Sequence, residues 1–295
     1  MTARIISGTD IAQQIREELK VEIDLLKSRH GIVPGLATVI VGDDPASQTY
    51  VNSKIKTCQA LGILSANYPL QESTSEKELL YLVKTLNDDP RINGVLVQVP
   101  LPKHINENRV LTAISPDKDV DGFHPINIGR MVIGEKAMLP CTPAGIQQLL
   151  IRSGVNTDGA EVVIVGRSNI VGKPIANILF QKTAGANSTV TVCHSATRDI
   201  ASHTRRADIL ISAIGKPRFI TAEMVKPGAT VIDVGTYEIG KTLQGKRILC
   251  GDVDFDNVKT VAGAITPVPG GVGPMTIVML MVNTVKAAKL AHGLA

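Results

Sequence analysis

The hydrophobic residues of the first hundred positions alternate between helical and extended spacing. Gly31 lies where a first helix would end, after a set of apolar residues at helical spacing. That set is Ile11, Ile15, Leu19, Ile23 and Leu26. The next stretch, "GLATVIVG", is apolar almost without interruption, which predicts a strand that is buried on both faces. Strands of this kind occur in mainly parallel sheets covered by helices.

Two further helices and a second strand are predicted up to about residue 100. "ASQTYVNSKIKTCQALG" has helical spacing through Val51, Ile55 and Cys58. "SEKELLYLVKTLN" opens with Ser75 and Glu78 at the positions of a capping box, which predicts that a helix starts there. "NGVLVQVPLP" is a second continuous apolar stretch and predicts another buried strand.

The second half of the chain has the same α/β pattern without repeating the sequence. In "PCTPAGIQQLL" we expect Thr142 to cap a helix and Pro143 to take its first position. "EVVIVG", "STVTVC", "ADILISAIG" and "ATVIDVG" predict strands, and an apolar helix from about Pro274 to Leu290 ends the pattern. The predicted fold class is therefore α/β, with two α/β domains that each contain a parallel sheet. Residues 1–140 plus 275–295 would form one domain and residues 141–274 the other, with a cleft between them.

Composition and charge exclude several classes of function. A chain of 295 residues with 44% apolar content can build two domains, and its net charge of +4 is small. With no Trp, four Phe and four Tyr, the chain has little to stack on bases, so we expect no nucleic-acid partner. The four cysteines are far apart and the histidines are scattered, which predicts reduced thiols and no metal site. No signal segment or membrane-length apolar run is visible, so we expect a cytoplasmic protein without membrane contact.

A nucleotide site is predicted at "EVVIVGRSNIVGKPIANIL", which has the order strand, tight turn, helix. Gly166 and Gly172 bracket the turn, although the middle glycine of the dinucleotide-binding pattern is missing. The next strand ends in "VCHSATR", without the carboxylate that usually accepts hydrogen bonds from the ribose hydroxyls of NAD. Arg167 and Ser195 would suit a 2′-phosphate instead, which predicts a Rossmann-like domain that binds NADP. The alternative is that both are solvated loop residues.

Candidate catalytic residues lie in the first half. Ser47, Tyr50 and Lys54 are spaced three and four apart and would share one helix face, although a lone helical lysine is usually only solvated. Gln98 interrupts an apolar strand near its carboxyl end, where parallel sheets bind ligands; a structural hydrogen bond is the alternative. "KDVDGFHP" places Asp121 beside a glycine, a pattern that ordinary turns also show.

The stretch "TPVPGGVGPMT" combines glycines and prolines immediately before the last apolar helix. Glycines let the backbone approach a flat ligand, and prolines hold the path of a loop before binding. We interpret the stretch as a rigid wall of the predicted cleft, while a purely structural proline–glycine hairpin is the alternative.

Taken together, these motifs resemble the bifunctional methylenetetrahydrofolate dehydrogenase/methenyltetrahydrofolate cyclohydrolase family. The matching stretches run in order over nearly the whole chain. They are "PASQTYVNSK", "GVLVQVPLP", "PDKDVDGFHP", "PCTPAGI", "VGRSNIVGKP", "TVCHSAT" and "ITPVPGGVGPMT". The resemblance implies oxidation of 5,10-methylenetetrahydrofolate with NADP⁺ and hydrolysis of the product to 10-formyltetrahydrofolate. It also implies a homodimer and a place in one-carbon metabolism.

The resemblance also assigns roles to individual residues. Lys54 would be the essential lysine, Gln98 its partner, Tyr50 the ring that stacks on the folate and Asp121 the carboxylate that holds the pterin. The remaining implied folate contacts are Ser47, Val97, Val99, Pro269, Gly270, Gly271, Val272 and Gly273. The implied NADP contacts are Gly166, Arg167, Ser168, Ser195 and Thr236; no metal is implied.

Two departures from the family pattern are visible. Val99 stands where the family usually has Leu, and the stretch after Gly235, which contains Thr236, replaces the usual Gly-Ile-Asn. Cofactor affinity at Thr236 is therefore open. Three other readings remain: a family member with dehydrogenase activity alone, a non-catalytic folate- or nucleotide-binding module, and an amino-acid dehydrogenase of similar build.

Overall fold

The computed structural model describes residues 2–242 and 244–294, except for the side chain of Ala46. The contacts divide the chain into two compact units. One consists of Gln14–Cys141 and Ile277–Ala295, and we call it the three-stranded unit; the other consists of Met1–Gln13 and Thr142–Thr276, and we call it the six-stranded unit. Among the described residues, no helix is long and apolar enough to cross a membrane.

The three-stranded unit is built on a parallel sheet in the order β3-β2-β4. Its strands are β2 (Gly35–Val41), β3 (Leu64–Leu70) and β4 (Gly94–Val97). Its helices are most of α1 (Gly8–His30), α2 (Pro45–Leu61), α3 (Glu76–Asp88), α4 (Glu107–Ala113), α5 (Pro125–Val132) and most of α10 (Val272–Ala291). Every residue of β2 and β4 is buried, as the continuous apolar pattern predicted.

Helix α3 forms as its sequence predicted. The Ser75 side chain accepts a hydrogen bond from the Glu78 backbone N–H, and the Glu78 carboxylate accepts one from the Ser75 N–H. The helix then buries Leu79, Val83 and Leu86 against the sheet side chains of the unit's core.

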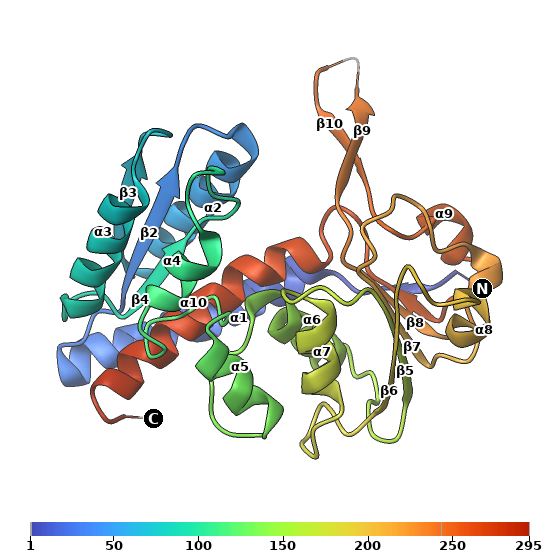
Figure 1. The fold of residues 1–295 in the computed structure, drawn as a ribbon. Helices are drawn as coiled ribbons and strands as arrows, with labels where there is room; N and C mark the ends of the chain where they lie inside the picture. Colours follow the sequence, from blue (N-terminus) through green and yellow to red (C-terminus); the bar gives the residue numbers. More distant parts are fainter. Residues whose placement is uncertain (1, 243, 295) are drawn as a thin grey trace. The chain divides into compact units, whose positions relative to one another are not determined.

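Helix α10 runs beside α1 in the three-stranded unit (Figure 1), and Lys289 Nζ lies 2.8 Å from Glu22 Oε1 across the pair. The Asn283 amide donates to the carbonyl oxygens of Val120 and Leu139 at 2.8 and 2.9 Å. The buried Asn283 therefore ties two loops to α10, since each buried carbonyl needs a donor.

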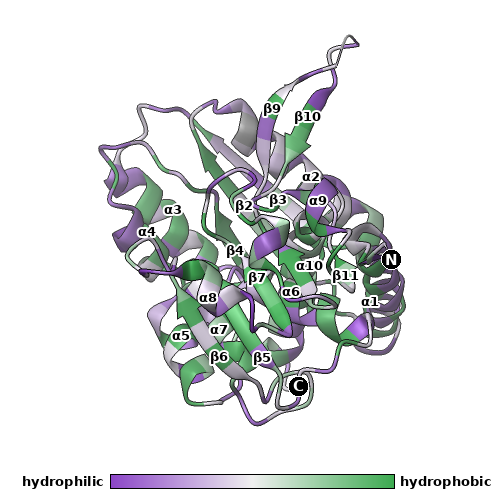
Figure 2. Cartoon of the chain, turned by 90° about the vertical axis from the view of Figure 1, so that its right-hand side faces the viewer, coloured by the Kyte–Doolittle hydropathy of each residue, from purple (hydrophilic) through white to green (hydrophobic). Residues whose placement is uncertain are grey.

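The six-stranded unit is built on a parallel sheet in the order β1-β11-β8-β7-β5-β6. Its strands are β1 (Arg4–Ile5), β5 (Glu161–Val165), β6 (Thr189–Cys193), β7 (Ile209–Ser212), β8 (Thr230–Asp233) and β11 (Ala264–Ile265). Its helices are α6 (Cys141–Arg152, from its second residue), α7 (Gly172–Leu179), α8 (Ile200–Thr204), η1 (Ala222–Met224) and α9 (Phe255–Val258). Strands β5 and β7 are almost entirely hydrophobic (Figure 2) and form the buried centre of the sheet.

The structure differs from the sequence predictions at three boundaries. Strand β1 pairs with β11, so the first thirteen residues belong to the six-stranded unit rather than to the predicted domain 1–140. Helix α6 begins at Cys141, so Thr142 is not its cap; the Thr142 hydroxyl instead lies 2.8 Å from the Thr276 hydroxyl. Helix α10 begins at Val272, two residues before Pro274.

A hairpin that the sequence analysis did not predict follows β8. Strands β9 (Tyr237–Lys241) and β10 (Arg247–Cys250) are antiparallel, and the hairpin extends away from the sheet of its unit (Figure 1). Most of its side chains are exposed, so the strands do not show the apolar run by which the others were recognised.

Two buried carboxylates tie this hairpin to the sheet. Asp252 accepts hydrogen bonds from the Tyr237 hydroxyl at 2.8 Å and from the backbone N–H groups of Ile214 and Lys216 at 2.9 and 3.0 Å. Asp233 at the end of β8 accepts from the backbone N–H groups of Asp252 and Val253. Burial, with Asp252 as a smaller contributor, raises the pKa of Asp233 to about 7.

This shift predicts a pH dependence of stability. Because the folded pKa of Asp233 lies above the usual value of 3.8, the folded state binds the proton more tightly than the unfolded state. Stability should therefore decrease as the pH rises from about 4 to 7, by at most about 1.4 kcal/mol per pH unit. We expect urea unfolding of Asp233→Asn to have a smaller slope against pH in this interval. The exposed Asp199→Asn is the control, and an unchanged slope in Asp233→Asn would contradict the assignment.

Candidate active site

Three polar side chains that the sequence singled out lie near the carboxyl edge of the three-stranded sheet. Lys54 is on α2, and its Nζ donates a hydrogen bond to Gln98 Oε1 at 3.0 Å. Gln98 directly follows β4, and its Nε2 donates to the Val99 carbonyl at 2.7 Å. Val95 of β4 and Asp119 form a parallel β-bridge. The chain after Asp119 therefore runs in the same direction as β4, so Asp121 lies toward the carboxyl end of that strand.

The two aspartates of "DVDG" have different surroundings. Asp119 is buried and organises the turn, because its oxygens accept from the backbone N–H groups of Phe123 and His124 and from Asn127 Nδ2. Asp119 is therefore a turn-forming aspartate. Asp121, partly buried, is the carboxylate whose charge acts on Lys54.

Burial opposes charge on each group of this cluster. It lowers the pKa of Lys54, and the charge of Asp121 offsets only part of that shift. Burial likewise raises the pKa of Asp121, and Asp119 adds to the rise while Lys54 reduces it. Burial also raises the pKa of the Cys141 thiol well above its usual value, so this thiol stays protonated. A lysine with a lowered pKa can accept a proton near neutral pH, which an ordinary surface lysine does poorly.

The other predicted folate contacts of this unit surround the same segments. Tyr50, one turn before Lys54 on α2, leaves about half of its surface exposed. Ser47 is buried in the first turn of α2, where its backbone N–H donates to the capping Asp44 carboxylate at 2.8 Å. Val97 is the buried last residue of β4, and Val99 is partly buried directly after Gln98.

Two residues that the sequence analysis did not assign to the site also contact these segments. Cys141 Sγ lies 3.3 Å from the Val120 carbonyl oxygen, beside Asp121. Asn283 holds the Val120 carbonyl from α10. The available signals were weak: Cys141 opens "CTPAGI", and Asn283 is a polar residue inside the apolar run "IVMLMVNTV".

The proline–glycine segment belongs to the six-stranded unit up to Thr276. Gly270 has a φ of +98°, and its carbonyl accepts the Thr9 N–H at 3.0 Å. A Cβ on Gly8 would overlap the carbonyl of Gly271. The start of α1 thus packs closely on this segment. Pro269 precedes the turn at Gly270, and Val272 and Gly273 already belong to α10. The prediction that the loop extends to Gly273 is therefore wrong, because Val272 and Gly273 lie in the first turn of α10.

The turn between β5 and α7 has the form of a phosphate-binding turn. A Cβ on Gly166 would overlap the Ala213 carbonyl, and one on Gly172 would overlap the Gly166 carbonyl. Only glycine fits these close approaches. Ser168 Oγ accepts from the backbone N–H groups of Val171 and Gly172 at 3.1 and 3.4 Å, which closes the turn before α7.

The residues around this turn fit the chemistry of NADP. Arg167 in the turn and Ser195 after β6 are both exposed, and no carboxylate occupies the end of β6. An exposed guanidinium and a hydroxyl can bind a 2′-phosphate, whereas a ribose diol without that phosphate would prefer a carboxylate. Thr236, also exposed, precedes the β9–β10 hairpin. No group of three or more His, Cys, Asp or Glu residues suited to a metal occurs in residues 2–242 and 244–294.

Comparisons with known families cover almost the whole chain. Residues 6–121 match the tetrahydrofolate dehydrogenase/cyclohydrolase catalytic domain, and residues 140–292 match the NAD(P)-binding domain of the same family. The bifunctional protein FolD of Dehalococcoides mccartyi is 65% identical over 294 residues, which cover 100% of this chain and 99% of that protein. FolD of Syntrophus aciditrophicus is 64% identical over 100% of both chains.

Solved structures give the same result. The Campylobacter jejuni FolD structure superposes with a TM-score of 0.91 at 47% identity, over 98% of this chain and 99% of that one. The Trypanosoma brucei FolD structure, complexed with NADP cofactor and an inhibitor, superposes with a TM-score of 0.92 at 40% identity over 99% of both chains. Both domain models, the full-length identity and the shared fold agree with the motifs on which the resemblance was based. The chain belongs to the tetrahydrofolate dehydrogenase/cyclohydrolase family.

Proposed function

We propose that this protein oxidises 5,10-methylenetetrahydrofolate to the methenyl compound with NADP⁺ and then hydrolyses that compound to 10-formyltetrahydrofolate. The observation that supports the hydrolytic step best is the hydrogen bond between Lys54 and Gln98, next to the charge of Asp121. The pKa of this partly buried amine is lowered, which suits the base that the hydrolytic step needs.

The first step requires orientation more than proton transfer. Bound NADP⁺ supplies the acceptor for a hydride, and no proton leaves the folate. We assign the pyrophosphate to the turn of Gly166 and Ser168, and the 2′-phosphate to Arg167 and Ser195. Tyr50 would stack on the aminobenzoyl ring of the folate.

The second step uses Lys54 as the base. A water molecule attacks the methenyl carbon, and the Lys54 amine takes a proton from that water. The C–N bond to the pterin ring then breaks while the hydroxyl group of the adduct loses its remaining proton to solvent and becomes the formyl C=O. The Lys54 ammonium returns the first proton to the departing nitrogen, so one proton is released overall. Gln98 holds the amine through its Oε1 throughout. The cationic substrate would favour both the neutral amine and an ionised Asp121, which could then accept hydrogen bonds from the pterin amino and ring N–H groups.

Product analysis tests the proposal directly. The protein is incubated with 5,10-methylenetetrahydrofolate and either NADP⁺ or NAD⁺, and the folates are separated after stopping the reaction. We expect NADPH and 10-formyltetrahydrofolate together, with slower turnover on NAD⁺. The dehydrogenase-only alternative predicts NADPH and methenyltetrahydrofolate. In that case 10-formyltetrahydrofolate would form no faster than by spontaneous hydrolysis of the methenyl compound. No NADPH would indicate a binding module.

We also propose that the protein is a cytoplasmic homodimer. The four cysteines are all unpaired and buried, which suits a reducing compartment. The resemblance to the family supports the homodimer, and sedimentation velocity of the 31.3 kDa chain distinguishes it from a monomer.

A further inference from the structure

A cavity of about 770 Å³ lies within the three-stranded unit, on the side where β4 begins. Ile92 and Asn93, directly before β4, form part of its wall, whereas Gln98 lies beyond the other end of the same strand. The remaining walls come from residues 115–118, helix α5, residues 136–138 and the C-terminal end of α10. The cavity is thus separated from the Lys54 cluster by the length of β4.

Positive charge dominates the lining. Lys118, Arg130, Lys136 and Lys286 contribute cationic groups, and Asp117 is the one carboxylate among the lining residues. Arg130, Lys136 and Lys286 form no ion pair with any carboxylate in the described part of the chain. A concave surface with several unpaired cations raises the local concentration of anions.

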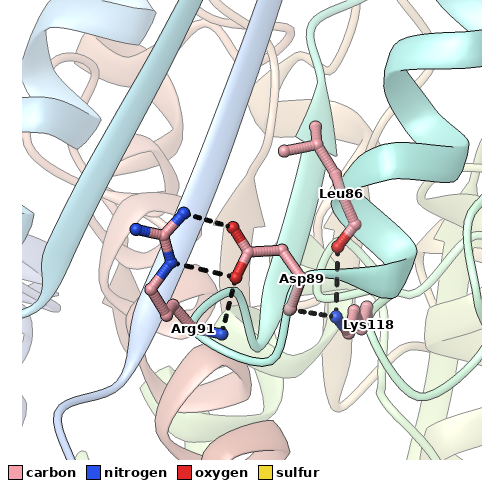
Figure 3. A network of polar contacts seen from close by, with 4 residues as sticks. All are labelled: Leu86, Asp89, Arg91 and Lys118. Carbon is pink, nitrogen blue, oxygen red and sulfur yellow. Dashed lines mark hydrogen bonds and ion pairs between the residues drawn. The ribbon is translucent and has the colours of Figure 1, made fainter.

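The charge of Lys118 is also not neutralised by a direct carboxylate contact. Figure 3 shows that Lys118 Nζ binds the backbone carbonyl oxygens of Leu86 and Asp89, at 3.1 and 2.8 Å. The Asp89 carboxylate turns instead to Arg91, which it binds through both oxygens. Carbonyl contacts position the ammonium without a direct carboxylate partner, and the nearby charges of Asp89 and Asp88 offset part of its charge.

Lys286 contributes a second lysine to the wall, near Lys136. It projects from the buried side of α10 and is only partly exposed, and its Nζ donates to the Ala137 carbonyl at 2.6 Å. Burial, and to a smaller extent Lys136, lowers the pKa of Lys286. A negative ligand group beside these two lysines would relieve that repulsion.

Most of the rest of the wall is apolar, and Asn93, Ser115, Asn127 and His292 are its other polar residues. Its apolar side chains come from the loop before β4, the Pro116 turn, residue 138 and the end of α10. They include Pro90, Ile92, Pro116, Met138, Ala287 and Leu290. A cavity of this size with apolar walls and few convergent charges is typical of a site for a small organic ligand.

We propose that this cavity binds a small organic anion with an apolar body and at least one carboxylate or phosphate group. The apolar body would contact Ile92, Met138 and Leu290. The anionic group would lie between Lys136 and Lys286, with Arg130 able to donate two parallel hydrogen bonds to it. The site is separate from the folate and NADP sites, so it does not depend on the proposed catalytic function.

Titration calorimetry on the full chain, saturated with NADP⁺ to occupy the nucleotide site, tests this proposal. The probes are phenyl phosphate, phthalate and the uncharged dimethyl phthalate. We expect at least one anionic probe to bind with millimolar or better affinity and the uncharged ester to bind at least about tenfold more weakly. The double variant Arg130→Gln/Lys136→Gln should lose at least about tenfold in affinity, since two cations at the site are removed. Which anionic probe binds more tightly distinguishes a phosphate ligand from a carboxylate ligand.

A matched control separates the site from general charge. Lys77→Gln changes an exposed lysine of the same unit, on α3 and outside the cavity, and should leave the affinity unchanged. Unchanged dehydrogenase activity shows that the double variant is folded. The proposal is overturned if neither anionic probe binds, if the ester binds equally well, or if the double variant and Lys77→Gln have the same affinity as the wild type.

Discussion

Replacing Lys54 by Met is expected to reduce cyclohydrolase turnover by a factor of about 10² to 10⁴, the usual contribution of a general base. Methionine keeps much of the apolar stem and removes the amine, so the hydrogen bond to Gln98 and the proton acceptor are lost together. Folate binding should remain, because Tyr50 and Asp121 are unchanged. The measurement is the decay of methenyltetrahydrofolate absorbance, with binding measured separately by calorimetry.

The control is Lys56→Met, two residues further along the same helix, where the lysine is exposed. It changes the same charge on α2 and should retain full cyclohydrolase turnover. If Lys54→Met hydrolysed methenyltetrahydrofolate at the wild-type rate, the assignment of the base would be wrong. If both variants were equally slow, the helix rather than the amine would be responsible.

Replacing Arg167 by Ala is expected to raise the Michaelis constant for NADP⁺ by roughly 10- to 100-fold and to change that for NAD⁺ far less. Only NADP⁺ carries the 2′-phosphate, and its charge-assisted hydrogen bonds to the guanidinium would be lost. The β5–α7 turn should persist, because Gly166, Gly172 and Ser168 hold it without the Arg167 side chain. Initial rates with each cofactor measure the effect.

Arg205→Ala is a suitable comparison, because Arg205 is an exposed arginine of the same unit at the end of α8. It removes one positive charge far along the chain from the glycine turn and should affect the two cofactors alike. Equal losses for NADP⁺ and NAD⁺ in Arg167→Ala would mean that another group binds the 2′-phosphate.

The sequence alone determined the family, the α/β class and most of the helices and buried strands. These features follow from local patterns: continuous apolar runs such as "GLATVIVG", the capping box at Ser75 and the glycine turn before α7. Such patterns act over a few residues, so neighbouring sequence is sufficient to recognise them. The β9–β10 hairpin was not predicted, because its exposed strands lack a continuous apolar run.

Only the tertiary structure decided which groups meet. Lys54 and Gln98 are 44 residues apart, and nothing local brings their side chains to 3.0 Å. The turn-forming role of Asp119 likewise depends on hydrogen bonds that form only in the folded chain. The sequence also could not reveal the cavity beside Lys286, or the pairing of β1 with β11 that moves the N-terminus into the other unit. These features depend on contacts between segments that are distant in the sequence. Tertiary packing determines how deeply each side chain is buried, and burial in turn shifts its pKa.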